Sequence, residues 1–170
     1  MNCLMVVTVK EDTMKNEEVC YTREVALENA IEMEMKSFQT YKKANLKIRE
    51  PHVKDLVKDL ALEELEHKYI LEKAYFEETA ALHEEGMKEG PSMKLSLLLK
   101  EKPLEDDADD QDVMIYAIHD EKRTVDFYKK MAEQCSGAPM EEMFKRLYQD
   151  EEAHLVRLEE VYESIYMRDM

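Results

Sequence analysis

The chain is poor in the residues that build turns, disulfides and membrane spans. Only 3 glycines and 4 prolines occur in 170 residues, so few positions suit tight turns and long helices are expected. The cysteines Cys3, Cys20 and Cys135 form no CxxC pair, which excludes a zinc ribbon, a four-cysteine iron site and a disulfide scaffold. This cysteine usage predicts a reducing, cytoplasmic location. No apolar run reaches the roughly 18 residues that span a bilayer, so no membrane segment is expected.

Basic residues are also scarce relative to acidic ones. Lys and Arg number 24 against 40 Asp and Glu, giving a formal net charge of −16. Binding to nucleic acid or to an anionic membrane needs basic patches, so both classes of partner are excluded. Hydrophobic residues nevertheless make up 44% of the chain. The sequence is therefore not a disordered acidic tail, and its length suits one folded domain.

Three breaks divide the chain into four predicted helices. The breaks are Arg49-Glu50-Pro51, the mixed segment 86–110, and Ser136-Gly137-Ala138-Pro139. They predict helices over about 22–48, 52–85, 110–135 and 139–168. The short first and third breaks predict antiparallel hairpins, and the long middle segment can cross the bundle from end to end. We expect an all-α four-helix bundle over residues 22–170, preceded by a loosely held N-terminal extension, residues 1–21.

The second half of the chain repeats the first at an offset of 87 residues. Residues 24–76 align with 111–163 without a gap and share 13 identities in 53 positions, where random matching gives roughly 4. The sequence therefore predicts an internal duplication of one helical hairpin.

Acidic and histidine side chains interrupt the apolar stripe of every predicted helix. A single glutamate does so in the first and third helices, and a Glu-x-x-His motif does so in the second and fourth. Residues three apart on a helix share a face, so each motif directs two ligand atoms to one spot. One such motif alone would be typical of a solvated helix surface. Here all six residues obey the 87-residue offset: Glu34, Glu64, His67, Glu121, Glu151 and His154.

Burial of four carboxylates in one bundle core needs compensation. Unpaired, they would cost many kcal/mol or would stay protonated. Two divalent cations would supply a charge of +4 against the −4 of the four glutamates. One Glu from each of two helices and Glu-x-x-His from each of the others is the dinuclear arrangement of ferritin-like carboxylate proteins. We therefore interpret the six residues as ligands of a dinuclear metal site.

Four runs of this sequence resemble the two halves of the rubrerythrin family's diiron domain. They are ALENAIEMEMKSFQTY, LALEELEHKYILEKAY, VMIYAIHDEKRTVDFY and LYQDEEAHLVRLEEVY, and the resemblance covers about residues 22–168. It implies a ferritin-like antiparallel bundle, with one or two of the glutamates bridging two iron ions. Manganese also suits this ligand set, and zinc can substitute in a purified sample. The resemblance further implies that Tyr41 and Tyr128 hydrogen-bond the site; the alternative is that they are only core aromatics.

The resemblance also implies an activity. We expect an oxidoreductase that reduces hydrogen peroxide or dioxygen with electrons from an external donor such as a rubredoxin, and that forms a homodimer. One alternative is a ferroxidase that handles iron for storage or delivery. A second alternative is a non-catalytic module that metal merely stabilises. The sequence leaves the choice of metal and of substrate open.

Several features depart from related families. Rubrerythrins carry an extra Glu three residues after the third-helix ligand, and here that position is Thr124, which weakens the expectation of peroxide reduction. No CxxC pair follows the bundle, so no rubredoxin domain is expected. Bacterioferritins place a haem-binding Met inside the first Glu-x-x-His motif, where this chain has Leu65 and Glu66. Three further histidines are expected to be solvated: His52, His83 and His119.

Overall fold

A computed structural model describes residues 5–8, 18–21, 23–77, 91–138 and 140–167. Within these residues lie four long helices, one short 3₁₀ helix and two short strands. The long helices are α1 (Arg23–Asn45), α2 (Pro51–Glu77), α3 (Asp110–Gln134) and α4 (Met140–Tyr166), and the 3₁₀ helix η1 spans Leu95–Leu97. None of the helices in the described part of the chain is both long and apolar enough to cross a membrane.

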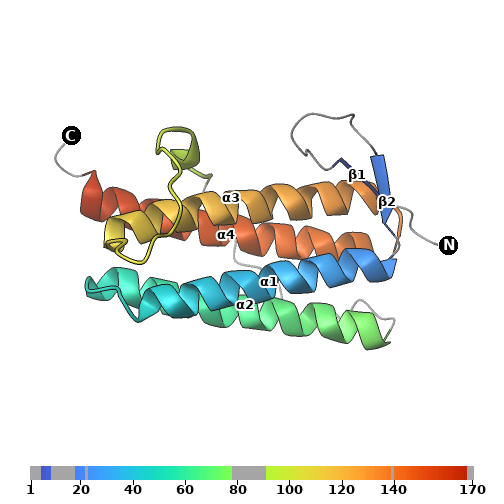
Figure 1. The fold of residues 1–170 in the computed structure, drawn as a ribbon. Helices are drawn as coiled ribbons and strands as arrows, with labels where there is room; N and C mark the ends of the chain where they lie inside the picture. The colour runs from blue at the N-terminus through green and yellow to red at the C-terminus, as the bar shows by residue number, and fades with distance from the viewer. Residues whose placement is uncertain (1–4, 9–17, 22, 78–90, 139, 168–170) are drawn as a thin grey trace.

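The helices form an antiparallel bundle made of two hairpins, α1 with α2 and α3 with α4 (Figure 1). Helix α2 reaches Glu77 at one end of the bundle, and α3 begins at Asp110 at the opposite end. The two ends of the connection between them therefore lie at opposite ends of the bundle. This arrangement confirms the expected ferritin-like four-helix bundle of two hairpins joined by a long crossover.

Local signals set the helix ends close to the expected positions. Pro51 is the first residue of α2, where its missing N–H costs no intrahelical bond. The Asp109 side chain accepts a hydrogen bond from the backbone N–H of Asp112 and caps α3. Gly137 has φ of 80° in the turn between α3 and α4, a left-handed conformation that favours glycine. Helix α1 ends three residues before the expected end, and residues 78–85 of the expected second helix lie outside the described residues.

Two short strands occur within the predicted N-terminal extension. Strand β1 (Met5–Thr8) pairs antiparallel with β2 (Glu18–Tyr21). Strand β1 also contacts α3, and β2 contacts α1. The described residues of this segment therefore form two paired strands beside the bundle. No strands were predicted from the sequence in this N-terminal extension.

The hydrophobic core consists of two clusters with a polar layer between them. One cluster includes Val57, Leu60 and Ile118, and the other includes Leu27, Leu71 and Phe144. Each draws on all four helices, and the apolar stripes expected for the second and fourth helices supply much of both. The layer between the clusters is where the stripes are interrupted by acidic and histidine side chains.

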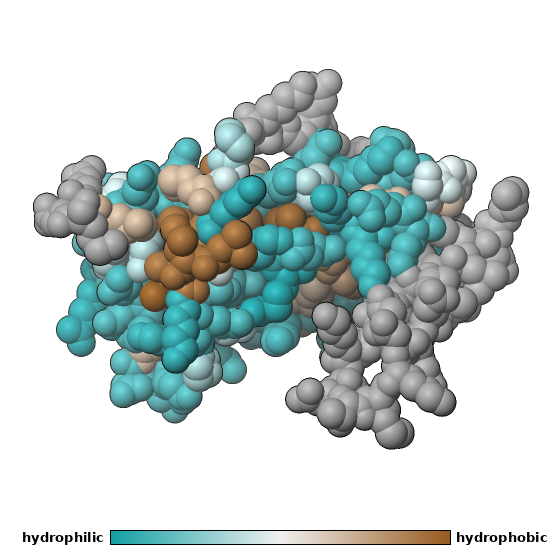
Figure 2. Space-filling view, turned by 90° about the horizontal axis from the view of Figure 1, so that it is seen from above, coloured by the Kyte–Doolittle hydropathy of each residue, from teal (hydrophilic) through white to brown (hydrophobic). Residues whose placement is uncertain are grey.

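A buried carboxylate on α4 helps to hold the described part of the crossover to the bundle. Glu159 on α4 accepts hydrogen bonds from the backbone N–H groups of Met93, at 2.6 Å, and Leu95, at 2.8 Å. Beyond this anchor the crossover presents an apolar surface, and Figure 2 shows a hydrophobic patch over this part of the bundle. Leu97 and Leu98 are 77% and 74% exposed.

Candidate metal centre

The six side chains singled out in the sequence meet in the polar layer. They form what we call the carboxylate–histidine cluster: Glu34 from α1, Glu64 and His67 from α2, Glu121 from α3, and Glu151 and His154 from α4. None is more than 5% exposed. Each helix contributes through the face that carries its apolar stripe, because the ligand positions continue that stripe.

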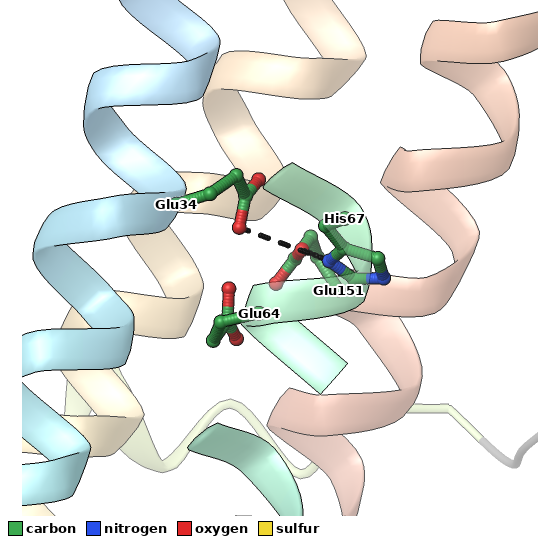
Figure 3. Close-up of side chains that lie close together, drawn as sticks. All are labelled: Glu34, Glu64, His67 and Glu151. Atoms are coloured by element: carbon green, nitrogen blue, oxygen red, sulfur yellow. Dashed lines mark ion pairs between the residues drawn. The ribbon is translucent and has the colours of Figure 1, made fainter. Parts of the chain in front are cut away.

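The cluster divides into two overlapping groups of potential ligand atoms. One consists of Glu34, Glu64, His67 and Glu151, and the other of Glu64, Glu121, Glu151 and His154. Within each group one ligand atom per residue lies within 4.8 Å of the others. Figure 3 shows the side chains of the first group converging from α1, α2 and α4. Glu64 and Glu151 belong to both groups, so these two carboxylates lie between the two positions.

The hydrogen bonding of the cluster fits a bound cation. Among the described residues, both carboxylate oxygens of Glu64 and of Glu151 are buried without a hydrogen-bond partner, as are Nδ1 of His67 and of His154. One carboxylate oxygen of Glu34 and one of Glu121 are likewise buried without a hydrogen-bond partner. Buried polar atoms are normally satisfied, so this many orphaned atoms on one site requires an explanation. Carboxylate oxygens and imidazole nitrogens are the donors that iron, manganese and zinc accept.

Both imidazole rings direct Nδ1 toward the carboxylates. Nδ1 of His67 lies 2.8 Å from Oε1 of Glu151, a charged contact that lacks hydrogen-bond geometry. Nδ1 of His154 lies 3.3 Å from oxygens of both Glu64 and Glu151. The two rings stack with centroids 5.3 Å apart and an interplanar angle of 12°. The duplication thus places two equivalent nitrogen donors side by side.

In the protein alone, protons balance the charge of the cluster. Burial disfavours a charged imidazole, yet the Glu151 carboxylate raises the pKa of His67 to about 10 and that of His154 well above its usual value. Burial and the Glu151 charge raise the pKa of Glu121 to about 8 and that of Glu64 well above its usual value. Burial would raise the pKa of Glu151 too, but the two imidazoliums hold it far below normal. A bound metal must therefore compete with protons on His67, His154, Glu64 and Glu121.

Two tyrosines connect the halves of the cluster. The Tyr41 hydroxyl on α1 donates a hydrogen bond to Glu121 on α3, and the Tyr128 hydroxyl on α3 donates one to Glu34 on α1. Both rings are almost fully buried, Tyr41 in one core cluster and Tyr128 in the other. Burial and the nearby carboxylates raise the pKa of both hydroxyls well above the usual value. Each tyrosine therefore stays protonated and orients one carboxylate.

Further charged groups lie outside the cluster, and the sequence reading missed them. Glu63 and Asp150 each come directly before a Glu-x-x-His motif. Oε2 of Glu63 lies 2.8 Å from Nε2 of His154, and Oδ2 of Asp150 lies 3.9 Å from Nε2 of His67. The available signal was an acidic residue at this position in both halves of the duplication. Each carboxylate faces the ring nitrogen that points away from the cluster.

The other positions of interest do not belong to these ligand groups. Thr124 is buried, and its hydroxyl donates to the backbone carbonyl of Asp120 in its own helix. His52 is exposed as expected. The expectation of a solvated His119 is wrong, because this residue is half-buried with Nε2 3.0 Å from the Leu99 carbonyl oxygen. His83 lies outside the described residues.

Fold and cluster together define a class, the ferritin-like four-helix bundles with a buried carboxylate–histidine centre. Comparison with known protein families then identifies the particular one. The sequence profile of the Rubrerythrin family matches residues 26–162, and the chain belongs to this family. Membership implies iron binding, with which the carboxylate–histidine cluster is compatible. Comparisons with curated proteins and with solved structures found no match.

Proposed function

We propose that this protein is a non-haem diiron oxidoreductase that reduces hydrogen peroxide or dioxygen with electrons from an external donor such as a rubredoxin. The observation that carries the proposal is the pair of overlapping ligand groups, buried and rich in unpartnered donor atoms. Such a site fits two cations of charge +2, which would balance the charges of the four carboxylates buried in one core.

The residues of each ligand group would hold one metal ion. Glu34 and His67 belong to one group only, and Glu121 and His154 belong only to the other. Glu64 and Glu151 belong to both, so these two carboxylates would help to hold both ions. We propose iron as the metal; manganese suits the same donors, and zinc can take its place during purification.

When bound, two ferrous ions would supply two electrons, one from each ion, enough to cleave the O–O bond of hydrogen peroxide or to reduce dioxygen to hydrogen peroxide. Hydrogen peroxide takes up these electrons and two protons and yields two molecules of water. The protein would hold the ligand carboxylates in position and keep water out. Tyr41 and Tyr128 contribute by fixing Glu121 and Glu34 through their hydroxyl groups.

One observation favours a second candidate, an iron-handling ferroxidase. Thr124 takes the position of an extra family glutamate, and its hydroxyl is bound within its own helix. The chain therefore offers no additional carboxylate there to rearrange around the metal during peroxide reduction. A ferroxidase would bind Fe(II) as a substrate and oxidise it repeatedly.

Rapid mixing separates the two candidates. The protein loaded with two Fe(II) per chain is mixed with hydrogen peroxide or with dioxygen, and near-ultraviolet absorption of Fe(III) is followed. We expect oxidation to be faster with peroxide than with dioxygen, and Fe(II) added beyond two per chain to be oxidised no faster than Fe(II) in protein-free buffer. If peroxide is no faster and surplus Fe(II) continues to be oxidised, the protein is a ferroxidase. Stable Fe(II) under both oxidants would indicate a non-catalytic, metal-stabilised module.

We also propose a homodimer, supported by an apolar stripe on the outer face of α2. Four residues of this helix are between 40% and 80% exposed: Leu62, Leu65, Tyr69 and Phe76. Their spacing places them along one side of the helix, and such a stripe is typical of an interaction surface.

Sedimentation velocity tests the dimer. We expect twice the chain mass of 20.1 kDa for the protein, and the chain mass for the variant Leu65→Lys, because a charge in the stripe opposes its burial. Leu46→Lys is the matched control, since Leu46 is 82% exposed and lies outside α2. A monomeric parent protein would exclude the dimer, and a dimeric Leu65→Lys variant would exclude this stripe as its interface.

A further inference from the structure

The two histidines of the cluster differ in how closely a carboxylate approaches the ring nitrogen that points away from the cluster. The carboxylate of Glu63 on α2 lies within hydrogen-bond distance of Nε2 of His154 on α4, at 2.8 Å. The equivalent carboxylate, Asp150 on α4, remains 3.9 Å from Nε2 of His67 on α2. The duplication makes the two residues equivalent in sequence, but aspartate is one methylene shorter than glutamate.

An arginine supports each of these carboxylates, again in different ways. Both oxygens of Glu63 accept from the guanidinium of Arg157 on α4, so this pair bridges the two hairpins at the cluster. Asp150 instead pairs with Nε of Arg146, one turn earlier in the same helix, at 2.9 Å. A two-point arginine–carboxylate contact fixes orientation better than a single contact does. Glu63 is therefore more firmly placed than Asp150.

Resting on the proposed diiron site, we propose that Glu63 and Asp150 are positioning residues for the two histidines, and that the half containing His154 binds its metal first and more tightly. The direct contact from Glu63 fixes the imidazole with its hydrogen on Nε2 and the lone pair of Nδ1 facing the cluster. Asp150 constrains His67 less, because it lies beyond direct hydrogen-bond distance. The duplicated site thus has two unequal positions.

The expected effect of losing such a partner is large for metal binding. A carboxylate that holds the outer nitrogen of a metal-binding histidine contributes about 10–100-fold in metal affinity. Glu63→Gln keeps the shape of the side chain but loses its charge. We therefore expect this variant to weaken the tighter position by about tenfold or more, whereas Asp150→Asn has a smaller effect, confined to the weaker position.

Titration of the metal-stripped protein with cobalt(II) alone tests this inference, by calorimetry and by visible absorption, which reports the coordination of cobalt. We expect two binding steps in the parent protein and a selective loss of affinity in the first step for Glu63→Gln. Arg157→Gln should weaken the same step, and combining it with Glu63→Gln should add little, because the arginine acts through Glu63. Glu66→Gln is the matched control, an exposed acid on the same helix.

The outcomes separate this inference from the proposed function. Two equal cobalt(II) sites in the parent protein, or a Glu63→Gln variant that binds like Glu66→Gln, would overturn the inference and leave the diiron proposal intact. A parent protein that binds no cobalt(II) would overturn both. A lower melting temperature in Glu63→Gln without any change in the first binding step would assign Glu63 a purely structural role and also overturn the inference.

Discussion

Stripping the bound metal with a chelator is expected to lower the melting temperature of this protein by about 10 °C or more. A ligand that binds only the folded state stabilises it by about 4 kcal/mol when its free concentration is roughly 1,000 times Kd. For a chain of this size, 1 kcal/mol corresponds to about 2–4 °C. The four buried glutamates of the cluster make the effect large, because without cations their charges must be balanced by protons. Differential scanning calorimetry before and after chelation measures the shift.

The size of this shift should grow with pH. In the stripped protein the pKa of His67 is raised from 6.5 to about 10, so its stabilising contribution is complete below pH 6.5 and is lost as the pH rises to 10. The pKa of Glu121 is raised from 4.5 to about 8. Its burial therefore costs stability increasingly as the pH rises from 4.5 to 8. Both contributions make the stripped protein less stable at pH 9 than at pH 6.

Metal binding has the opposite dependence on pH, because the ligands bind in their deprotonated forms. The metal-loaded protein should therefore keep its melting temperature between pH 6 and pH 9, while that of the stripped protein falls. Equal melting temperatures for the stripped and the metal-loaded protein at every pH would contradict a buried metal site among these residues. A difference in melting temperature that becomes smaller as the pH rises would contradict the displacement of protons from the ligands by the metal.

The sequence predicts the bundle and the cluster well, because both depend on periodicity along a helix. Once the 87-residue repeat is recognised, the positions of Glu34 and Glu121 follow from the stripes, as do both Glu-x-x-His motifs. A helical stripe determines which side chains face the core, and the hairpin turns determine which helices are neighbours. Facing residues at one height in the bundle must then meet.

Contacts between side chains on different elements could not be predicted from helical periodicity. The pair of Glu63 with Arg157 joins side chains 94 positions apart, at the edge of the core. Periodicity places both near the surface, where a charge is ordinarily solvated. The hydrogen bond of His119 to the crossover depends on the path of an irregular segment, which no stripe describes. The pairing of β1 with β2 likewise depends on long-range backbone partners.

The glutamates shared by both ligand groups should be the most costly to remove. Replacing Glu64 or Glu151 by Ala is expected to reduce bound metal from two per chain to fewer than one, because each contributes to both positions. Replacing Glu34 by Ala should remove only the metal of its own group and leave about one per chain. Metal analysis by mass spectrometry after loading and desalting gives the ratio for each variant.

Loss of folding would not account for such a result, and circular dichroism can show this. Ala is the best helix former, so each replacement keeps the local preference for a helical backbone. The helical content of each variant should therefore match that of the parent, and the volume-matched variant Glu64→Gln should lose metal in the same way. Glu66→Ala, a substitution of an exposed acid in the same helix, should retain two metals per chain. A Glu64→Ala variant that still binds two metals, or that loses no more metal than Glu34→Ala, would show that Glu64 does not bridge the two positions.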